Sequence, residues 1–153
     1  MRRRRNGHRD DRRGPLSGDD TPESVSISAS ALAAACAHAS REAPNECCGL
    51  LVGTPGIIDE AVAIRNVLNS PTRYQIDPAE HIVLNRRLRG SGRSIVGAYH
   101  SHPLTAAVPS PRDIAEAHYP EFVWLIVSLL GELPECRAFR ISEGRVMELR
   151  ISS

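Results

Sequence analysis

Four side chains suited to catalysis or metal binding stand close together in the stretch HSHPLTAAVPSPRD, residues 100–113. One residue separates His100 from His102, seven separate His102 from Ser110, and two separate Ser110 from Asp113. Side chains on a strand alternate between its two faces, so a strand through the histidines points both imidazoles at one place. The apolar residues before them predict a buried strand end, where two imidazoles are costly without partners. A metal ion would partner both rings.

A set of two histidines and one aspartate is typical of only a few kinds of metal site. With one position left open for water, it has the composition of a catalytic zinc site. The same ligands occur in non-haem iron sites, which usually lie on all-β barrels, whereas here a helix supplies the carboxylate of Asp113. Zinc sites of the cytidine-deaminase type need a P-C-x-x-C segment, which this sequence lacks. Neither alternative fits as well as the catalytic zinc site.

The residues Ser110-Pro111-Arg112-Asp113 also have a plain structural interpretation as the start of a helix. Serine is a preferred N-cap, proline suits the first helical position, and an acidic side chain in the first turn faces the positive end of the dipole. The two interpretations are compatible. A capping hydroxyl accepts a backbone N–H and keeps its own proton to donate into a cleft.

The rest of the sequence predicts a mixture of strands and helices that would position these residues. An Ala-rich segment predicts a helix over 28–42 with Ser28 as its cap, and Asp77 caps a second helix over 78–90. Residues 69–72 read as a loop, followed by a short extended segment at 74–77. Strands are predicted over 24–28, 47–53, 57–68, 94–102, 122–130, 136–142 and 145–152, with hairpins joining the second to the third and the sixth to the seventh.

Composition favours one domain in a reducing compartment. The chain has 153 residues, of which 41% are hydrophobic, and this is enough for a single core. Residues 1–22 hold seven arginines and almost nothing apolar, so we predict a disordered Arg-rich leader there and the folded domain over 23–153.

No apolar run suits a secretory signal or a membrane span. The four cysteines include no C-x-x-C pair, which favours a reduced, cytoplasmic protein. The folded part carries a net charge of about −2, so neither a nucleic acid nor a membrane is expected as a partner.

The motif HSHPLTAAVPSPRD, together with PNECCGLLVG at residues 44–53, resembles the JAMM or MPN-plus (JAB domain) metalloproteases. The resemblance covers about residues 25–151 in element order and includes NSPTRYQID between the two motifs. It implies a cytidine-deaminase-like α/β fold, a single three-layer domain in which helices flank a mixed, curved sheet. Among the branches of the family, the sequence is most similar to compact prokaryotic enzymes that process ubiquitin-like sulfur-carrier proteins.

The resemblance also implies roles for individual residues. His100, His102 and Asp113 would bind one zinc ion per chain, with a water molecule as the fourth ligand. Glu46 would hold this water and act as the general base, and the Ser110 hydroxyl would stabilise the oxyanion. Spacing alone does not place Glu46 near the site, since it lies 54 residues before His100. From the residues alone it is a surface glutamate at a strand start, with Glu42 as a nearby alternative.

The implied activity is hydrolysis of the amide bond after the C-terminal Gly-Gly of a carrier protein, releasing an amino acid such as cysteine or a conjugated protein. The alternatives are a catalytically silent MPN scaffold that binds protein partners and a general small-peptide hydrolase. Tyr74 and Gln75 would border a groove for the carrier tail, although core packing also explains Tyr74. The remaining candidates have simpler roles, as core cysteines or surface helix histidines: Cys47, Cys48, His81 and His118.

Overall fold

A computed structural model describes residues 23–153, so the leader predicted over 1–22 lies outside the described residues. The described chain forms seven strands and three helices in mixed order. The strands are β1 (Ser24–Ile27), β2 (Cys48–Thr54), β3 (Ile57–Ile64), β4 (Ser94–His102), β5 (Val123–Ser128), β6 (Glu135–Ser142) and β7 (Arg145–Ser152). The helices are α1 (Ala29–Glu42), α2 (Pro78–Leu88) and α3 (Pro111–Ala115).

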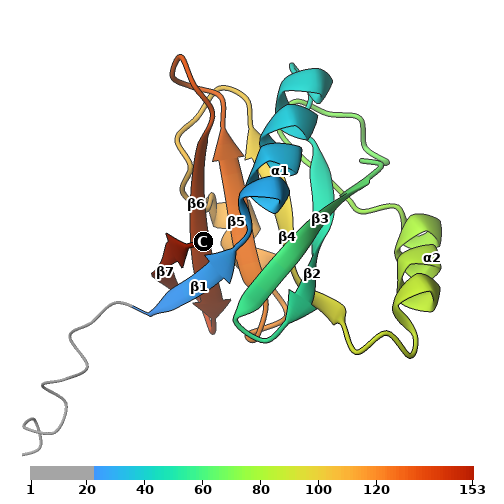
Figure 1. The fold of residues 1–153 in the computed structure, drawn as a ribbon. Coiled ribbons are helices and arrows are strands. Elements are labelled where there is room, and N and C mark those ends of the chain that lie inside the picture. The colour runs from blue at the N-terminus through green and yellow to red at the C-terminus, as the bar shows by residue number, and fades with distance from the viewer. Residues whose placement is uncertain (1–22) are drawn as a thin grey trace, which may run out of the picture.

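All seven strands belong to one mixed sheet with the order β1-β3-β2-β4-β5-β6-β7 (Figure 1). The pairs β1 with β3, β1 with β7 and β4 with β5 are parallel, and the other pairs are antiparallel. The two predicted hairpins, β2 with β3 and β6 with β7, are confirmed. The pairing of β1 with β7 also closes the sheet into a barrel, which the sequence analysis did not predict.

Helices cover both faces of the sheet, as the predicted three-layer fold requires. The Ala-rich face of α1 packs on one face through Ala31, Ala35 and Ala39, where small side chains let the helix approach closely. On the other face, Leu84 and Leu88 of α2 pack into a second apolar cluster. Figure 1 shows α1 in front of the strands and α2 at the right. Within residues 23–153, the longest apolar helical stretch is too short to cross a bilayer.

The predicted helix caps are present. The Ser28 side chain accepts a hydrogen bond from the Ala31 N–H, and the Asp77 side chain accepts one from the Ala79 N–H. The strand prediction over 57–68 is wrong at its end, because β3 stops at Ile64. Beyond Ile64 the hydrogen bonds between strands end, and the Asn66 side chain accepts hydrogen bonds from the backbone N–H groups of Leu68 and Gln75 instead.

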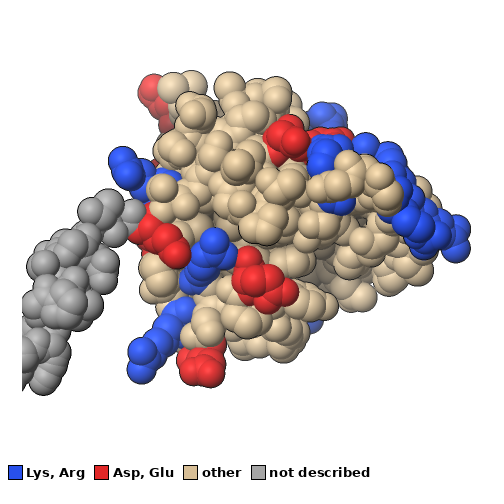
Figure 2. All heavy atoms as spheres, turned by 60° about the horizontal axis from the view of Figure 1, so that its bottom comes forward, with Lys and Arg blue, Asp and Glu red and all other residues tan. Residues whose placement is uncertain are grey.

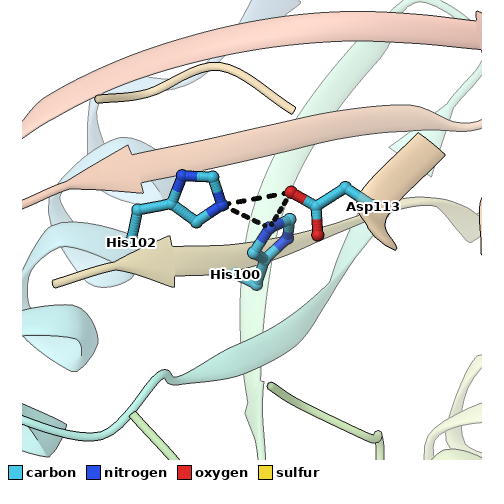
Figure 3. Close-up of side chains that lie close together, drawn as sticks. All are labelled: His100, His102 and Asp113. Atoms are coloured by element: carbon cyan, nitrogen blue, oxygen red, sulfur yellow. Dashed lines mark hydrogen bonds and ion pairs between the residues drawn. The ribbon is translucent and has the colours of Figure 1, made fainter. Parts of the chain in front are cut away.

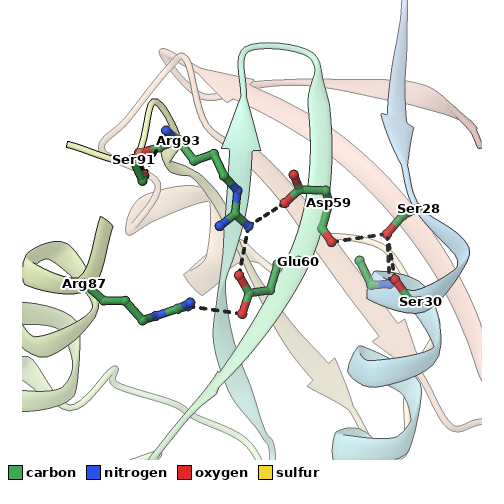
Figure 4. Close-up of polar contacts among 8 residues, drawn as sticks. Ser28, Ser30, Asp59, Glu60, Arg87, Ser91 and Arg93 are labelled. Atoms are coloured by element: carbon green, nitrogen blue, oxygen red, sulfur yellow. Dashed lines mark hydrogen bonds and ion pairs between the residues drawn. The ribbon is translucent and has the colours of Figure 1, made fainter. Parts of the chain in front are cut away.

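An ion-pair network fixes the end of α2 against β3 (Figure 4). Arg93 bonds Asp59 at 2.6 Å and Glu60 at 2.9 Å, and Arg87 of α2 bonds the other Glu60 oxygen at 3.1 Å. Exposed pairs of this kind contribute up to about 1 kcal/mol each, so their main effect is positional. They hold α2 beside the sheet face on which β4 presents its histidines.

Candidate metal centre

Three potential ligand atoms converge at the end of β4 (Figure 3). The Nε2 atoms of His100 and His102 are 3.2 Å apart, and each lies 3.1 Å from Oδ2 of Asp113. The two imidazoles come from the same face of β4, and the carboxylate comes from the first turn of α3. Both histidines are buried, with 2% and 5% of their surface exposed. The structure therefore brings together the three residues that the sequence proposes as ligands.

This triangle fits a small divalent cation. A tetrahedral ion about 2.0–2.1 Å from each ligand separates the ligand atoms by about 3.3 Å, close to the three observed separations. Two imidazole lone pairs and a carboxylate oxygen at such short range repel one another unless a proton or a metal ion lies between them. The donor set and its spacing both favour a metal centre with one side open.

Neighbouring groups orient each ligand. Nδ1 of His102 lies 2.8 Å from the carbonyl oxygen of Ala106, an acceptor that assigns the proton to Nδ1 and turns the Nε2 lone pair towards the centre. Oδ2 of Asp113 also accepts the Ser110 N–H at 2.9 Å, as half of a capping box. The ring of His100 stacks on Tyr74 with the centroids 4.5 Å apart. Its Nδ1 is buried without a partner among residues 23–153.

The charges at the centre favour a cation. Burial by itself would raise the pKa of Asp113, but its hydrogen bonds to both imidazoles and to the Ser110 N–H outweigh burial and hold this pKa well below its usual range. Burial also opposes protonation of His102, yet its hydrogen bonds to Asp113 and to the Ala106 carbonyl raise its pKa. The carboxylate is thus kept charged, and positive charge beside it is stabilised.

Glu46 reaches the centre through the pairing of β2 with β4. Cys48 lies opposite His100 in the antiparallel register. Two hydrogen bonds continue this register: Cys47 N–H donates to the Ser101 hydroxyl oxygen at 2.8 Å, and Ser101 N–H donates to the Cys47 carbonyl at 3.1 Å. Continued by one residue, this register would bring Glu46 to His102, and the charges of His102 and Asp113 do act on the Glu46 carboxyl group.

The environment of Glu46 suits a general base. It is only 8% exposed, and burial, the largest influence, raises the pKa of its carboxyl group to about 7. The positive charge of His102 lowers this pKa, and the Asp113 carboxylate raises it. A carboxyl group with a pKa near neutrality can both take up and return a proton at physiological pH. Glu42, the alternative from the sequence, is exposed at the end of α1.

Ser110 caps α3 next to these groups. Its hydroxyl oxygen accepts the Asp113 N–H at 3.0 Å and its side chain is partly exposed. The proton of the hydroxyl has no acceptor within residues 23–153, so it can be donated to a group arriving at the centre. The capping interpretation is therefore confirmed, and the geometry leaves the catalytic interpretation open.

A groove of about 520 Å³ lies beside β4. Its floor includes Ala98, which precedes His100 by two residues and lies on the same face of β4. Tyr74, which stacks on His100, lines the end of the groove that is nearest to the centre. Its walls come from α2 and from the segment between α3 and β5. Side chains that line it include Tyr74, Ile76, Asn85, Ala98, Phe122 and Trp124. Tyr74 is thus both a partly buried partner of His100 and a wall of the groove.

The segment 74–76 offers unpaired backbone groups to this groove. Val67 N–H donates to the Gln75 carbonyl, and Gln75 N–H donates to the Asn66 side chain, so Gln75 faces the 65–67 segment. The alternation of an extended chain turns Tyr74 and Ile76 the other way. Among residues 23–153, their backbone groups have no hydrogen-bond partner.

Asn66 is a positioning residue that sequence reasoning missed. Its side-chain nitrogen donates to the carbonyls of Glu46 and Arg73, and its oxygen accepts the N–H groups of Leu68 and Gln75. It therefore ties the backbone of Glu46 to the segment that borders the groove. A polar side chain at the end of an apolar strand was the only signal in the sequence.

The other candidates lie outside the ligand triangle. Cys47 and Cys48 are buried, as predicted, and neither belongs to the cluster of possible metal ligands in the described chain. His81 is partly buried on α2, where it lines the groove. His118 is exposed as expected, but its predicted helical position is wrong. The helix α3 ends at Ala115, so His118 lies in the following loop.

Comparisons with known proteins agree with this geometry. A family model described as prokaryotic homologs of the JAB domain matches residues 28–142. The CysO-cysteine peptidase of Mycobacterium tuberculosis is 35% identical over 115 residues, which are 73% of this chain and 79% of that protein. The probable TtuB-protein conjugate cleaving protease of Thermus thermophilus is 37% identical over 114 residues, 74% of this chain and 73% of that protein. A solution structure from Desulfitobacterium hafniense has a TM-score of 0.76 and 32% identity, covering 84% of this chain and 91% of that one.

Proposed function

The chain belongs to the prokaryotic homologs of the JAB domain, and from this membership we propose a zinc-dependent peptidase or isopeptidase. Its substrate is a ubiquitin-like sulfur-carrier protein, and the bond hydrolysed is the amide after the C-terminal Gly-Gly. The released group is an amino acid, such as cysteine, or a conjugated protein. The names of the relatives support both forms, since one is a CysO-cysteine peptidase and the other cleaves TtuB-protein conjugates. They also favour hydrolysis over a catalytically silent scaffold.

The observation that carries the proposal is the buried Glu46 carboxyl group, which lies near enough to His102 and Asp113 for their charges to shift its pKa. His100, His102 and Asp113 would hold the zinc ion. A zinc ion in this position supplies a bound water with a pKa of about 7 and polarises the scissile carbonyl. The residues around it then have to move one proton and to stabilise one negative charge.

Glu46 moves the proton. Its carboxylate takes the proton of the attacking water and returns it to the nitrogen of the leaving amine. Burial raises the pKa of Glu46 in the metal-free chain to about 7, so its carboxyl group can both accept and release a proton near neutral pH. The Ser110 hydroxyl donates to the oxygen that becomes negative as the carbonyl is attacked. Its hydrogen bond from the Asp113 N–H holds the hydroxyl oxygen in place and leaves its proton free.

The groove along β4 would receive the extended tail of the carrier. Backbone N–H and C=O groups of Tyr74 and Ile76 can pair with the tail as an added strand, a mode of recognition that does not depend on tail side chains. A tail that ends in Gly-Gly has no side chains to clash with Tyr74 or with the buried imidazoles. This favours Gly-Gly next to the scissile bond.

Basic side chains gather at the C-terminal end of α2, the helix that supplies one wall of the groove. Arg86, Arg87 and Arg89 are exposed at the end of the helix, and Figure 2 shows the basic residues gathered at the right, over α2. Arg87 pairs with Glu60, whereas no carboxylate in the described chain pairs with Arg86 or Arg89. This charge supports a carrier with acidic side chains around the base of its tail.

The experiment is cleavage of a purified sulfur-carrier protein extended beyond Gly-Gly by a short peptide, followed by mass spectrometry. We expect one cut, directly after the second glycine, in the presence of zinc and none after chelation. A matched carrier ending in Ala-Ala before the extension should resist cleavage. Cleavage of free short peptides, with the carrier left intact, would instead support the general small-peptide hydrolase.

A further inference from the structure

Two cysteines from distant parts of the chain touch each other. Cys36 lies in α1 and Cys136 in β6, 100 residues apart in sequence, and their Sγ atoms are 3.4 Å apart. Both are free thiols and partly exposed. A disulfide bond requires a sulfur separation of about 2.0 Å, so a small side-chain movement would close this gap.

The surroundings hold the two thiols in contact and leave them accessible. Both cysteines are partly buried residues that pack against the apolar core cluster beneath α1, and this packing keeps the two side chains next to each other. Cys136 lies opposite Val127 of β5, which in turn lies opposite Ser101 of β4, so the three side chains share one face of the sheet. Val127 belongs to the apolar cluster beneath α1, and the cysteine pair therefore lies on the α1 side of the sheet.

The other two cysteines do not share this accessibility. Cys47 and Cys48 are 1% and 0% exposed. Burial raises the pKa of Cys47 to about 11 and that of Cys48 to about 12, which keeps both as unreactive thiols. Thiol chemistry is thus directed to the partly exposed pair.

We propose that Cys36 and Cys136 form a modification site. A low-molecular-weight disulfide oxidises these two thiols, which become an intramolecular disulfide bond. The Cys36 thiolate attacks one sulfur of the oxidant RSSR, forming a mixed disulfide and releasing one RSH. The Cys136 sulfur then attacks Sγ of Cys36 and expels the second RSH. Two protein thiols lose two protons and two electrons, and RSSR is reduced to two RSH. Because Sγ of Cys136 lies only 3.4 Å from Sγ of Cys36, the second step is intramolecular and needs no further molecule.

The bond would fasten α1 to β6 across the sheet. Cross-linking residues so far apart in sequence restricts the unfolded chain strongly and raises stability. The metal centre lies on the opposite face, where His100 and His102 point towards α3, so metal binding should not change. In the reducing cytoplasm that we propose for this chain, the bond would form only when the thiol–disulfide balance becomes more oxidising.

The experiment treats the full-length reduced protein with oxidised glutathione, then alkylates it and maps its peptides without reductant. We expect a Cys36–Cys136 linked peptide, no retained glutathione, and an unfolding midpoint that rises by several degrees and returns with dithiothreitol. Cys136→Ser should retain glutathione on Cys36, and neither Cys136→Ser nor Cys36→Ser should show the reversible shift. Glutathione that stays on wild-type Cys36, a link through Cys47 or Cys48, or no reaction at Cys36 would overturn the proposal.

Discussion

Ser101 and Cys47 exchange two hydrogen bonds between the end of β4 and the residue before β2. The Cys47 N–H donates to the Ser101 hydroxyl at 2.8 Å, and the Ser101 N–H donates to the Cys47 carbonyl at 3.1 Å. Ser101 separates the two histidines in sequence, and Cys47 follows Glu46 directly. This single contact therefore joins the proposed base to the proposed ligands, from the opposite face of the sheet.

Ser101→Ala should weaken both stability and catalysis. The variant leaves the buried Cys47 N–H without its acceptor, which costs about 1–3 kcal/mol of unfolding free energy. We expect kcat to fall while the zinc content stays at the wild-type value, because the ligands do not change. Urea unfolding, metal analysis and turnover measure the three quantities. Ser142→Ala, at an exposed serine of β6, is the matched control. An unchanged kcat in Ser101→Ala would contradict the positioning role.

Substitutions of Asn66 should separate the two functions of its side chain. Asn66→Ala removes all four hydrogen bonds and should lower the unfolding midpoint and raise KM, because the 74–76 segment loses its anchor. Asn66→Asp keeps the acceptor for the Leu68 and Gln75 N–H groups but loses the donor to the Glu46 and Arg73 carbonyls. We expect it to restore much of KM but little of kcat. Equal kinetics in the two variants would show that the donor does not matter.

Glu46 should make the stability of the metal-free protein depend on pH. Its pKa is about 7 in the folded chain and near 4.5 when unfolded, so the folded state binds the proton more tightly. The resulting stabilisation is complete below the unfolded pKa and is lost as pH rises through the folded pKa, a change of up to about 3 kcal/mol. Urea unfolding at pH 5 and pH 8 in chelator measures it. Glu46→Gln should reduce the difference between the two pH values, and an identical pH dependence in the variant would contradict the raised pKa.

Tyr74 should act through its ring. Its stacking on His100 at 4.5 Å is the sort of contact that contributes about 0.5–1.5 kcal/mol. Tyr74 also lines the groove, so Tyr74→Ala removes a ring contact with the tail and should raise KM for the carrier by roughly threefold to tenfold. Tyr74→Phe, which keeps the ring, should resemble the wild type. Steady-state kinetics with the extended carrier decide the matter. A loss in Tyr74→Phe as large as in Tyr74→Ala would point to the hydroxyl instead.

Much of the fold follows from local sequence. The caps Ser28 and Asp77, the Ala-rich helix and the two hairpins depend on neighbouring residues, so patterns in the sequence reveal them. The closure of the barrel by β1 and β7 joins strands that begin 121 residues apart, and no local pattern specifies it. The early end of β3 depends on one side chain, Asn66, which replaces the backbone ladder.

Some residues of the site can likewise be predicted from local sequence, and others cannot. The convergence of His100 and His102 follows from the alternation of a strand, and the place of Asp113 follows from a helix cap. Glu46 could be selected only through resemblance to a family, because its position depends on the register between β2 and β4. Cys36 and Cys136 gave no signal at all, since only the packing of α1 on the sheet brings them together.

We propose above all that Glu46 transfers the proton at the zinc centre and is not itself a zinc ligand. The most direct test is to measure zinc content and turnover of the extended carrier on one preparation of Glu46→Gln. We expect about one zinc per chain, as in the wild type, with cleavage reduced by several orders of magnitude. Full cleavage by the variant, or a loss of zinc together with activity, would contradict it.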